Sequence, residues 1–404
     1  MPLTRRRFLE TVSGALVAAG VLGRRQGTDA DPLGVRDDFP AATEGIYLDS
    51  AYITPSPVQV HDAGHAFLEA KTRRPIALGD MLRKTDEVRG QYARLINAGE
   101  DEVAFLYATS EGENIVSRAL DLQEGDNVVV DALHYDGTFV NYRQLEAERG
   151  IELRIAQATD GAAPPEAFES LVDDRTRLVS VAWVSHQNGY RHDMRRLADL
   201  AHAHGAYLYT DGIQAVGMIR TDVAAEGIDF MAAGTYKWLL GGFGVAPFFI
   251  RRDLVDRIRP DRAGMLQAAE TLEDHRFELH TSARKFEYAT LAFAAIYQLN
   301  AGLGYLERIG IDTIEAHGVA LADRVQTGLR DAGLRVATPP GNRTSIVAVH
   351  NEGDGEATAR RLDEARVKVS LREGGRQIRV SPALFNTASD VDRFLEVATA
   401  AIMA

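Results

Sequence analysis

The chain has 404 residues, and its 45 Lys and Arg against 58 Asp and Glu give a formal net charge of -13. A hydrophobic fraction of 45% and a charged fraction of 25% are ordinary for a globular protein and exclude global disorder, while the acidic balance argues against a nucleic-acid partner. The sequence contains no cysteine, which excludes disulfides, thiolate metal sites and every mechanism with a cysteine nucleophile. We expect no metal site.

The first thirty residues have the layout of an export signal. Arg5, Arg6 and Arg7 precede Phe8 and Leu9, and a short apolar stretch follows over residues 12–22. A basic region before a short apolar run is typical of a secretory signal, and this run is too short to span a bilayer comfortably. The arrangement resembles a twin-arginine signal, which implies export to the periplasm or the cell exterior. A cytoplasmic protein with an unused leader is the alternative, and no later stretch of the sequence is apolar enough to span a membrane.

Short apolar runs alternate with helical patterns along the first part of the chain. The expected helices cover residues 58–98, 110–120, 137–149 and 194–204. The expected strands cover residues 103–107, 127–130, 152–155, 178–184, 206–210, 230–233 and 245–250. This alternation predicts βαβ units and therefore an α/β fold with a mainly parallel sheet.

The pattern changes near residue 290. A helix expected over residues 291–309 leads into a mixed tail with strands over 345–350, 367–370 and 377–380. We therefore predict a signal peptide over residues 1–30, an N-terminal segment over 31–60, a large α/β domain over 61–300 and a smaller α+β domain over 301–404.

Two polar residues stand where predicted strands end, which is where ligands bind in α/β sheets. Asp211 follows one strand and precedes Gly212, so it either points into a crevice or caps a helix. Lys237 lies among aromatic, leucine and glycine residues. Partial desolvation there would lower its pKa and make the amine a nucleophile. The alternative is a surface lysine whose stem covers apolar neighbours.

Two further segments suit a phosphate and a planar ring. Thr109 and Ser110 follow a strand and open a helix, where backbone N–H groups bind anions, although an ordinary capping box explains the same residues. Tyr135 follows the valine-rich strand and either stacks on a planar ligand or is a half-buried loop residue. Together with Asp211 and Lys237, these features match the requirements of pyridoxal 5′-phosphate (PLP).

With these residues in place, the sequence resembles the class V aminotransferase superfamily, PLP-dependent enzymes of fold type I. The branch it resembles contains isopenicillin N epimerase-like and cysteine desulfurase-like proteins. The resemblance covers nearly all of the chain after the leader. It implies a large domain with a mainly parallel sheet and a smaller α+β C-terminal domain. It rests on motifs in a shared order, at residues 47–51, 109–114, 211–217, 235–238, 286–290 and 378–387.

The resemblance also implies a role for each candidate residue. Lys237 would be the Schiff-base lysine and the catalytic residue, and Asp211 would hold the pyridinium. The other implied cofactor contacts are Gln214 at the phenolate oxygen, Thr109 and Ser110 at the phosphate, Tyr135 on the ring, Tyr236 beside the lysine, and Thr290 at the phosphate of the partner in a homodimer. Arg379 would bind the substrate α-carboxylate, and His186 lies near the expected substrate.

The predicted function is that of a PLP-dependent enzyme acting at Cα of an amino acid or modified amino acid, of the isopenicillin N epimerase-like type. An aminotransferase or a C–S lyase of the same family is the alternative. A non-catalytic protein that only binds PLP is a further one. A desulfurase that forms a persulfide on its own cysteine is disfavoured, because the chain has no cysteine.

Overall fold

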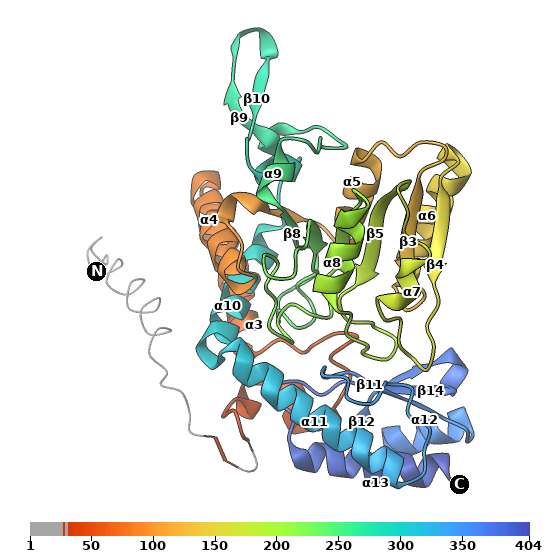
Figure 1. The fold of residues 1–404 in the computed structure, drawn as a ribbon. Helices are drawn as coiled ribbons and strands as arrows, with labels where there is room; N and C mark the ends of the chain where they lie inside the picture. Colours follow the sequence, from red (N-terminus) through yellow and green to blue (C-terminus); the bar gives the residue numbers. More distant parts are fainter. Residues whose placement is uncertain (1–26, 29–30) are drawn as a thin grey trace, which may run out of the picture.

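The computed structural model describes residues 27–28 and 31–404, so the predicted export signal over 1–30 lies almost entirely outside the described residues. Figure 1 shows a large upper part around a central sheet and a smaller lower part formed mainly by the C-terminal region. Among the helices in the described ranges, none is long and apolar enough to cross a membrane.

A seven-stranded sheet forms the centre of the large part, in the order β2-β8-β7-β6-β5-β3-β4. Its strands are β2 (Val103–Leu106), β3 (Asn127–Asp131), β4 (Glu152–Ala156), β5 (Thr176–Ala182), β6 (Tyr207–Asp211), β7 (Phe230–Ala232) and β8 (Ala246–Ile250). β8 runs antiparallel to β2 and β7, and every other neighbouring pair is parallel. The predicted α/β fold with a mainly parallel sheet is confirmed.

Helices cover both faces of this sheet, because side chains alternate between the faces along each strand. Val129 packs into the core formed with α4 (Leu78–Leu95), α8 (Met194–Ala203) and α10 (Phe293–Ile309). Its neighbours Val128 and Val130 pack into a second core with α5 (Thr109–Ala119) and α6 (Asp136–Arg149). With both faces buried, the strand ends are the places where a ligand can reach the sheet.

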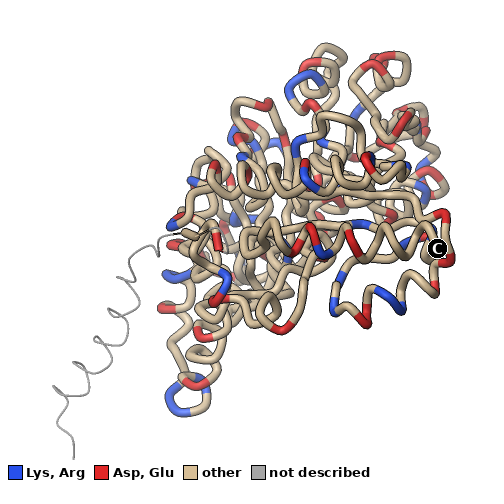
Figure 2. Tube along the Cα trace, turned by 90° about the horizontal axis from the view of Figure 1, so that it is seen from below, with Lys and Arg blue, Asp and Glu red and all other residues tan. Residues whose placement is uncertain are grey.

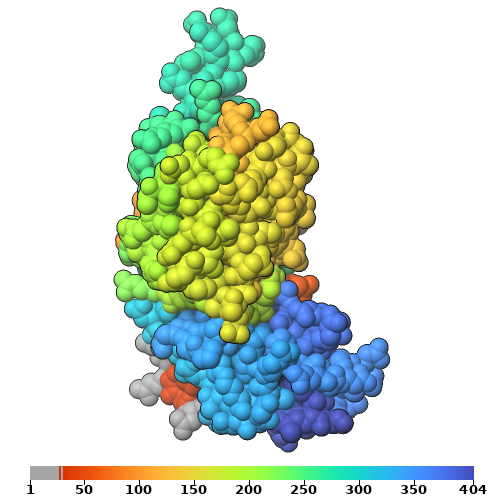
Figure 3. Space-filling model, turned by 45° about the vertical axis from the view of Figure 1, so that its right-hand side comes forward, coloured from red at the N-terminus to blue at the C-terminus, as the bar shows by residue number. Residues whose placement is uncertain are grey.

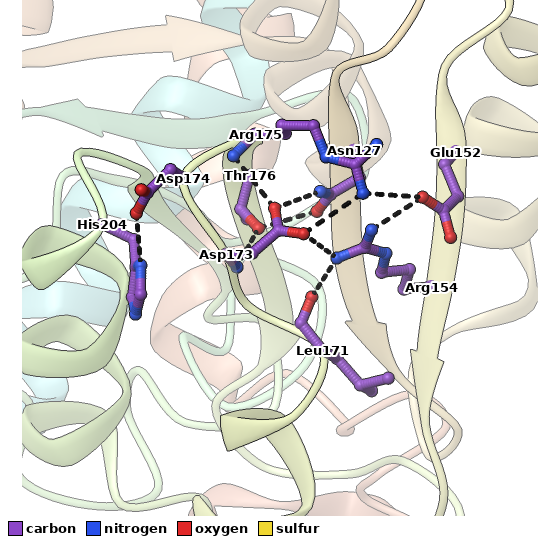
Figure 4. A network of polar contacts seen from close by, with 9 residues as sticks. All are labelled: Asn127, Glu152, Arg154, Leu171, Asp173, Asp174, Arg175, Thr176 and His204. Atoms are coloured by element: carbon purple, nitrogen blue, oxygen red, sulfur yellow. Dashed lines mark hydrogen bonds and ion pairs between the residues drawn. The ribbon is translucent and has the colours of Figure 1, made fainter.

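A polar network joins the amino-terminal ends of β3, β4 and β5 (Figure 4). The Asp173 carboxylate accepts hydrogen bonds from Asn127 Nδ2 and Arg154 Nη1, both at 2.9 Å, and Arg154 Nη2 donates to Glu152 at 2.8 Å. This edge is opposite to the carboxyl ends of the strands. The network therefore stabilises the fold and takes no part in the site.

The helix expected over residues 58–98 is two helices, α3 (Val58–Arg73) and α4. Pro75 lies in the break between them. A proline forces the residue before it out of the helical conformation, and Arg74 is extended, with φ -155° and ψ 91°. The expectation of one long helix was wrong because it ignored this restriction.

The C-terminal part has its own hydrophobic core and a three-stranded antiparallel sheet in the order β11-β14-β13. Its elements are α11 (Ile311–Asp331), β11 (Val347–His350), α12 (Gly355–Glu364), β13 (Ser370–Arg372), β14 (Gln377–Val380) and α13 (Ala388–Ile402). The single strand expected over 367–370 is divided, because β12 (Val367–Lys368) pairs with β1 (Ile46–Tyr47) while β13 pairs with β14. The domain division at residue 300 stays a prediction, and α10 runs through it.

The N-terminal segment contacts both parts of the molecule. The Phe39 ring packs in a tilted arrangement against Phe385, with centroids 4.7 Å apart, and meets the Tyr305 ring edge-on. Arg36 forms an ion pair with Asp390 at 2.7 Å. The remaining short helices are α2 (Pro40–Glu44), α7 (Glu166–Glu169) and α9 (Arg252–Val255). In the large part, Ser56 Oγ donates to Leu240 O at 3.0 Å, so the N-terminal segment links the two parts.

A β-hairpin projects from the large part, away from the C-terminal region (Figures 1 and 3). It consists of β9 (Ala268–Thr271) and β10 (Phe277–Leu279), and it exposes the apolar side chains of Phe277 and Leu279. Acidic and basic residues are interspersed along the described chain (Figure 2).

Candidate active site

A cavity of about 590 Å³ lies at the carboxyl ends of β5 and β6, between the large part and the β13–β14 hairpin. Sequence-predicted site residues gather around it, and the structure brings nine of them together: Thr109, Ser110, Tyr135, His186, Asp211, Gln214, Tyr236, Lys237 and Arg379. Thr290 lies elsewhere and lines a separate hollow with Glu111 and Tyr288.

Lys237 lies in the loop between β7 and β8, and its side chain points into the cavity. Burial lowers the pKa of its amine to about 8, and the positive charges of Arg379 and Arg372 act in the same direction. The carboxylate of Asp211 opposes this and raises the pKa. Roughly 9% of the amine is therefore unprotonated at pH 7, far more than for a solvated lysine, and only the unprotonated form can act as a nucleophile or a proton acceptor.

Asp211 is the last residue of β6, and Gln214 follows in the next turn. One Asp211 carboxylate oxygen accepts a hydrogen bond from the backbone N–H of Ile213 at 2.9 Å, and burial raises the pKa of the group. A cation at this carboxylate would relieve that cost. Gln214 is fixed at both ends, because Nε2 donates to Ala51 O and Oε1 accepts from Trp238 Nε1, each at 2.8 Å.

Helix α5 begins at Thr109 and presents its first turn to the cavity. The residue before it is Ala108, and no side chain caps this end of the helix. The Thr109 hydroxyl accepts a hydrogen bond from Gly234 N at 2.9 Å, so it connects α5 to the loop that carries Lys237. Of the capping box only the Glu111 contact is present, in which Oε2 accepts from Tyr107 N at 2.7 Å, and Ala108 has no side chain to cap the first-turn N–H groups. Uncapped N–H groups at the start of a helix can bind an anion.

Aromatic rings border the cavity. Tyr135 is 50% exposed and meets the ring of His186 edge-on, with centroids 5.6 Å apart. Tyr236 stacks on Phe243 with centroids 4.4 Å apart, and Lys237 Nζ lies 5.8 Å from the Tyr236 ring centroid. These side chains offer flat apolar walls on which a planar ligand can rest.

Arg379 lies on β14, and neighbouring polar groups hold its guanidinium in place. Nη1 donates to His186 O at 2.7 Å, and Nη2 donates to Ser370 Oγ at 2.9 Å and faces Asp49 Oδ1 at 3.5 Å. Ser370 Oγ also donates to Asp49 at 2.5 Å. Burial lowers the pKa of Arg379 to about 10, with Asp49 opposing the shift.

His186 is surrounded by cations. Burial and the charges of Arg372, Lys237 and Arg379 lower its pKa to about 3, so the imidazole is neutral over the physiological range. Its Nε2 accepts a hydrogen bond from Arg372 Nη2 at 3.2 Å, because an arginine can only donate. The other ring nitrogen, Nδ1, then carries the proton, and it is buried without a hydrogen-bond partner within the described chain.

The segment that contains Thr290 is held by a buried ion pair. Arg89 Nη1 lies 2.7 Å from Glu287 Oε1, and the two side chains are 4% and 3% exposed. Glu287 also accepts from Phe105 N at 2.8 Å. Thr290 does not reach the cavity of its own chain, and its expected contact with the cofactor of a partner stays a prediction.

The sequence analysis did not single out three side chains that shape the site: Asp49, Ser370 and Arg372. The sequence analysis included Asp49 in the motif at residues 47–51 but assigned it no role. It reaches Arg379 because it forms a β-bridge with Ser381. Ser370 and Arg372 are two positions apart on β13, and a turn at Gly374 and Gly375 connects β13 to β14, the strand of Arg379. This spacing was the signal available in the sequence, but the predicted strand ended at residue 370 and therefore did not include Arg372.

Comparisons with known proteins agree with this geometry. The family model described as aminotransferase class-V matches residues 46–394. A protein of Methanothermobacter thermautotrophicus named probable cysteine desulfurase is 31% identical over 381 residues, covering 88% of this chain and 94% of that protein.

Solved structures share the fold. The apo cysteine desulfurase of Thermococcus onnurineus superimposes with a TM-score of 0.85 at 24% identity, covering 94% of this chain and 100% of that one. A complex between the cystine C–S lyase C-DES and its product cysteine persulfide has a TM-score of 0.83 at 17% identity, covering 89% of this chain and 99% of the other. These relatives are named cysteine desulfurases and not isopenicillin N epimerases, so they do not support the expected epimerase-like type. They also do not support the expectation that a desulfurase is disfavoured.

Proposed function

Since the chain belongs to the class V aminotransferase family and is a PLP-dependent enzyme, we propose that it is a C–S lyase that acts on a sulfur-containing α-amino acid. The observation that supports this best is the single cavity that joins Lys237, with a pKa of about 8, to Asp211 on one side and Arg379 on the other. Cofactor chemistry and carboxylate binding thus meet at one place.

The residues present fit PLP. Lys237 supplies an amine for its aldehyde, and the buried Asp211 carboxylate, whose pKa is raised by burial, suits a protonated ring nitrogen. The uncapped first turn of α5, with Thr109 and Ser110, suits its phosphate. When bound, PLP withdraws electrons from the amino-acid Cα and makes its proton labile.

The residues of the protein would have separate roles in this reaction. Arg379 would bind the α-carboxylate, because a guanidinium matches a carboxylate with two parallel hydrogen bonds. Lys237, with a pKa of about 8, would accept the Cα proton. The neutral His186 lines the same cavity and accepts a hydrogen bond from Arg372 through Nε2, so it would hold that arginine in position.

The choice of C–S lyase reconciles two observations. The relatives are named cysteine desulfurases, yet this chain has no cysteine on which to form a persulfide. In β-elimination the Cα proton is lost, a Cα–Cβ double bond forms, and the Cβ–S bond breaks with its electron pair leaving on sulfur. Addition of water then yields pyruvate and ammonium. The sulfur leaves with the departing fragment, so no protein thiol is needed. That a fold neighbour is described as a cystine C–S lyase supports this choice.

Three rival activities give different products from the same site. An aminotransferase would convert the amino acid to its oxo acid with retention of sulfur, an epimerase would give the other stereoisomer, and a protein that only binds PLP would leave the amino acid unchanged. Incubating the holo-protein with cystine, cysteine or alanine and assaying pyruvate, released thiol and stereochemistry separates these cases. Pyruvate with stoichiometric thiol or persulfide is the expected result, and its absence with all sulfur amino acids would refute the lyase.

The cofactor attachment is tested separately by borohydride reduction and peptide mapping. The reduced adduct should lie on Lys237 and be absent from a Lys237→Ala variant. Lys285 is the matched control, because burial also lowers its pKa while its Nζ donates to Val255 O away from the cavity. An adduct on Lys285, or none, would contradict the assignment.

We also propose that the active form is a homodimer. Thr290 lines a hollow apart from the cavity of its own chain, and the projecting β9–β10 hairpin exposes Phe277 and Leu279. Both features suit a surface that a second copy covers. This arrangement would let each chain complete the site of the other.

Export by the twin-arginine route is our proposal for the leader, based on Arg5, Arg6 and the apolar run that follows. An enzyme that must fold around PLP in the cytoplasm needs a route for folded proteins. The basic motif and the short apolar run provide the address that such a route reads.

A further inference from the structure

A second arginine, Arg372, stands on the cavity wall beside Arg379. β13 pairs with β14 so that Ser370 is opposite Arg379 and Arg372 is opposite Gln377. Ser370 and Arg372 are two positions apart on one strand and share a face of the sheet. Arg372 and Arg379 are therefore diagonal neighbours on that face, a spacing of roughly 7–8 Å between Cα atoms in antiparallel pairs.

The two arginines differ in how their charge is balanced. Arg379 has the carboxylate of Asp49 at 3.5 Å. Arg372 donates only to neutral acceptors, from Nη1 to His186 O at 3.1 Å and from Nη2 to His186 Nε2 at 3.2 Å. Within the described chain, no carboxylate lies within ion-pair distance of Arg372. Its guanidinium has five N–H donors, so further donors stay open for a ligand.

Both guanidinium groups donate to one atom, the backbone oxygen of His186, which places two like charges side by side at the cavity. An α-carboxylate bound at Arg379 leaves Arg372 without an anionic partner of its own. A second anionic group on the same substrate would pair with Arg372, and the spacing across the hairpin suits groups a few bonds apart.

We propose that Arg372 binds a second anionic group on the substrate, so that the enzyme selects α-amino acids whose side chain or leaving fragment carries a carboxylate or similar anion. This inference rests on the proposed function, since it takes Arg379 as the α-carboxylate site. Arg372 is then a specificity-determining residue of the same cavity.

The test measures binding without turnover. Succinate, with two carboxylates, and propionate, with one, are titrated into holo-protein by calorimetry. For Arg372→Met the ratio of succinate to propionate affinity should fall by about 10- to 100-fold, the amount expected for a lost charged hydrogen-bonded contact. Arg376→Met is the matched control, because Arg376 is an exposed arginine of the same hairpin outside the cavity, and it should leave the ratio as it is.

An unchanged ratio for Arg372→Met, or an equal fall for Arg376→Met, would overturn the proposal. If Arg372→Met does not fold, Arg372→Lys retains a charge but loses the planar fork, and a smaller fall in the same ratio is expected. No fall in that variant would also count against it. Neither ligand has an amino group, so this experiment can fail while the lyase assay succeeds, and the reverse.

Discussion

Raising the pH from 7 to 10 should change the reactivity of Lys237 far less than that of a solvated lysine, because the cavity already lowers its pKa to about 8. An amine with that pKa is roughly 9% unprotonated at pH 7, against about 0.04% for a lysine at its ordinary value. For equal intrinsic nucleophilicity, Lys237 would react about 200-fold faster at pH 7 and only about threefold to fourfold faster at pH 10. The ratio of the two rates should therefore fall roughly 60-fold over this range.

Apo-protein and Nα-acetyl-lysine compete in one tube for limiting pyridoxal phosphate, and borohydride quenches the mixture before mass spectrometry. Both amines meet the same aldehyde, so the ionisation of the aldehyde cancels in the ratio. A ratio that stays flat with pH would refute the lowered pKa. In Asp211→Asn the carboxylate that raises the pKa of Lys237 is gone, so the inflection should move to lower pH. A move to higher pH would contradict this electrostatic account.

The remaining predictions concern stability, assembly and location. Glu287→Leu leaves the buried Arg89 with only Asp86, at 3.4 Å, as an anionic partner, and it should cost about 3–5 kcal/mol of unfolding free energy in urea. The double variant Arg89→Met/Glu287→Leu should recover part of this loss, whereas equal losses in both variants would argue against a charge effect. Sedimentation velocity of the holo-protein should give a single species of twice the chain mass, and a monomer with full PLP occupancy would refute the shared site. Cell fractionation should find the wild type outside the cytoplasm and Arg5→Lys/Arg6→Lys inside it, whereas cytoplasmic retention of both would rule out the export signal.

The sequence predicted the fold well where hydrophobic patterning alone decides it. The valine run of β3 is buried on both faces, as expected of a central parallel strand, and Asp211 ends β6 next to the cavity. The prediction failed where a local restriction on the backbone or a change of strand partner overrides the hydrophobic pattern. Pro75 interrupts the long helix, and the chain at Val369 leaves one sheet pairing for another. Neither change alters the average hydrophobicity on which the prediction relied.

The sequence predicted that Lys237 and Asp211 lie at one cavity, but it did not predict that Arg372 and Asp49 lie there or next to it. Lys237 and Asp211 each stand at the end of a recognisable element, so their positions follow from the order of strands. Arg372 and Asp49 acquire meaning only through contacts between segments far apart in the sequence, the β13–β14 register and the bridge from Asp49 to Ser381. Tertiary pairings of this kind leave no periodic signal in either segment.

The two halves of the cavity are therefore built by different elements of the fold, so one half can change while the other stays the same. The proposed cofactor half belongs to the seven-stranded sheet, where the hydrogen bond from Gly234 N to the Thr109 hydroxyl connects the first turn of α5 to the loop of Lys237. The proposed substrate half belongs to one antiparallel hairpin, which carries Arg372 and Arg379. Changes in the hairpin can alter which anionic groups are bound without disturbing the sheet. In the proposed lyase reaction the sulfur leaves on the departing fragment, so the reaction needs no protein thiol, and the chain has no cysteine.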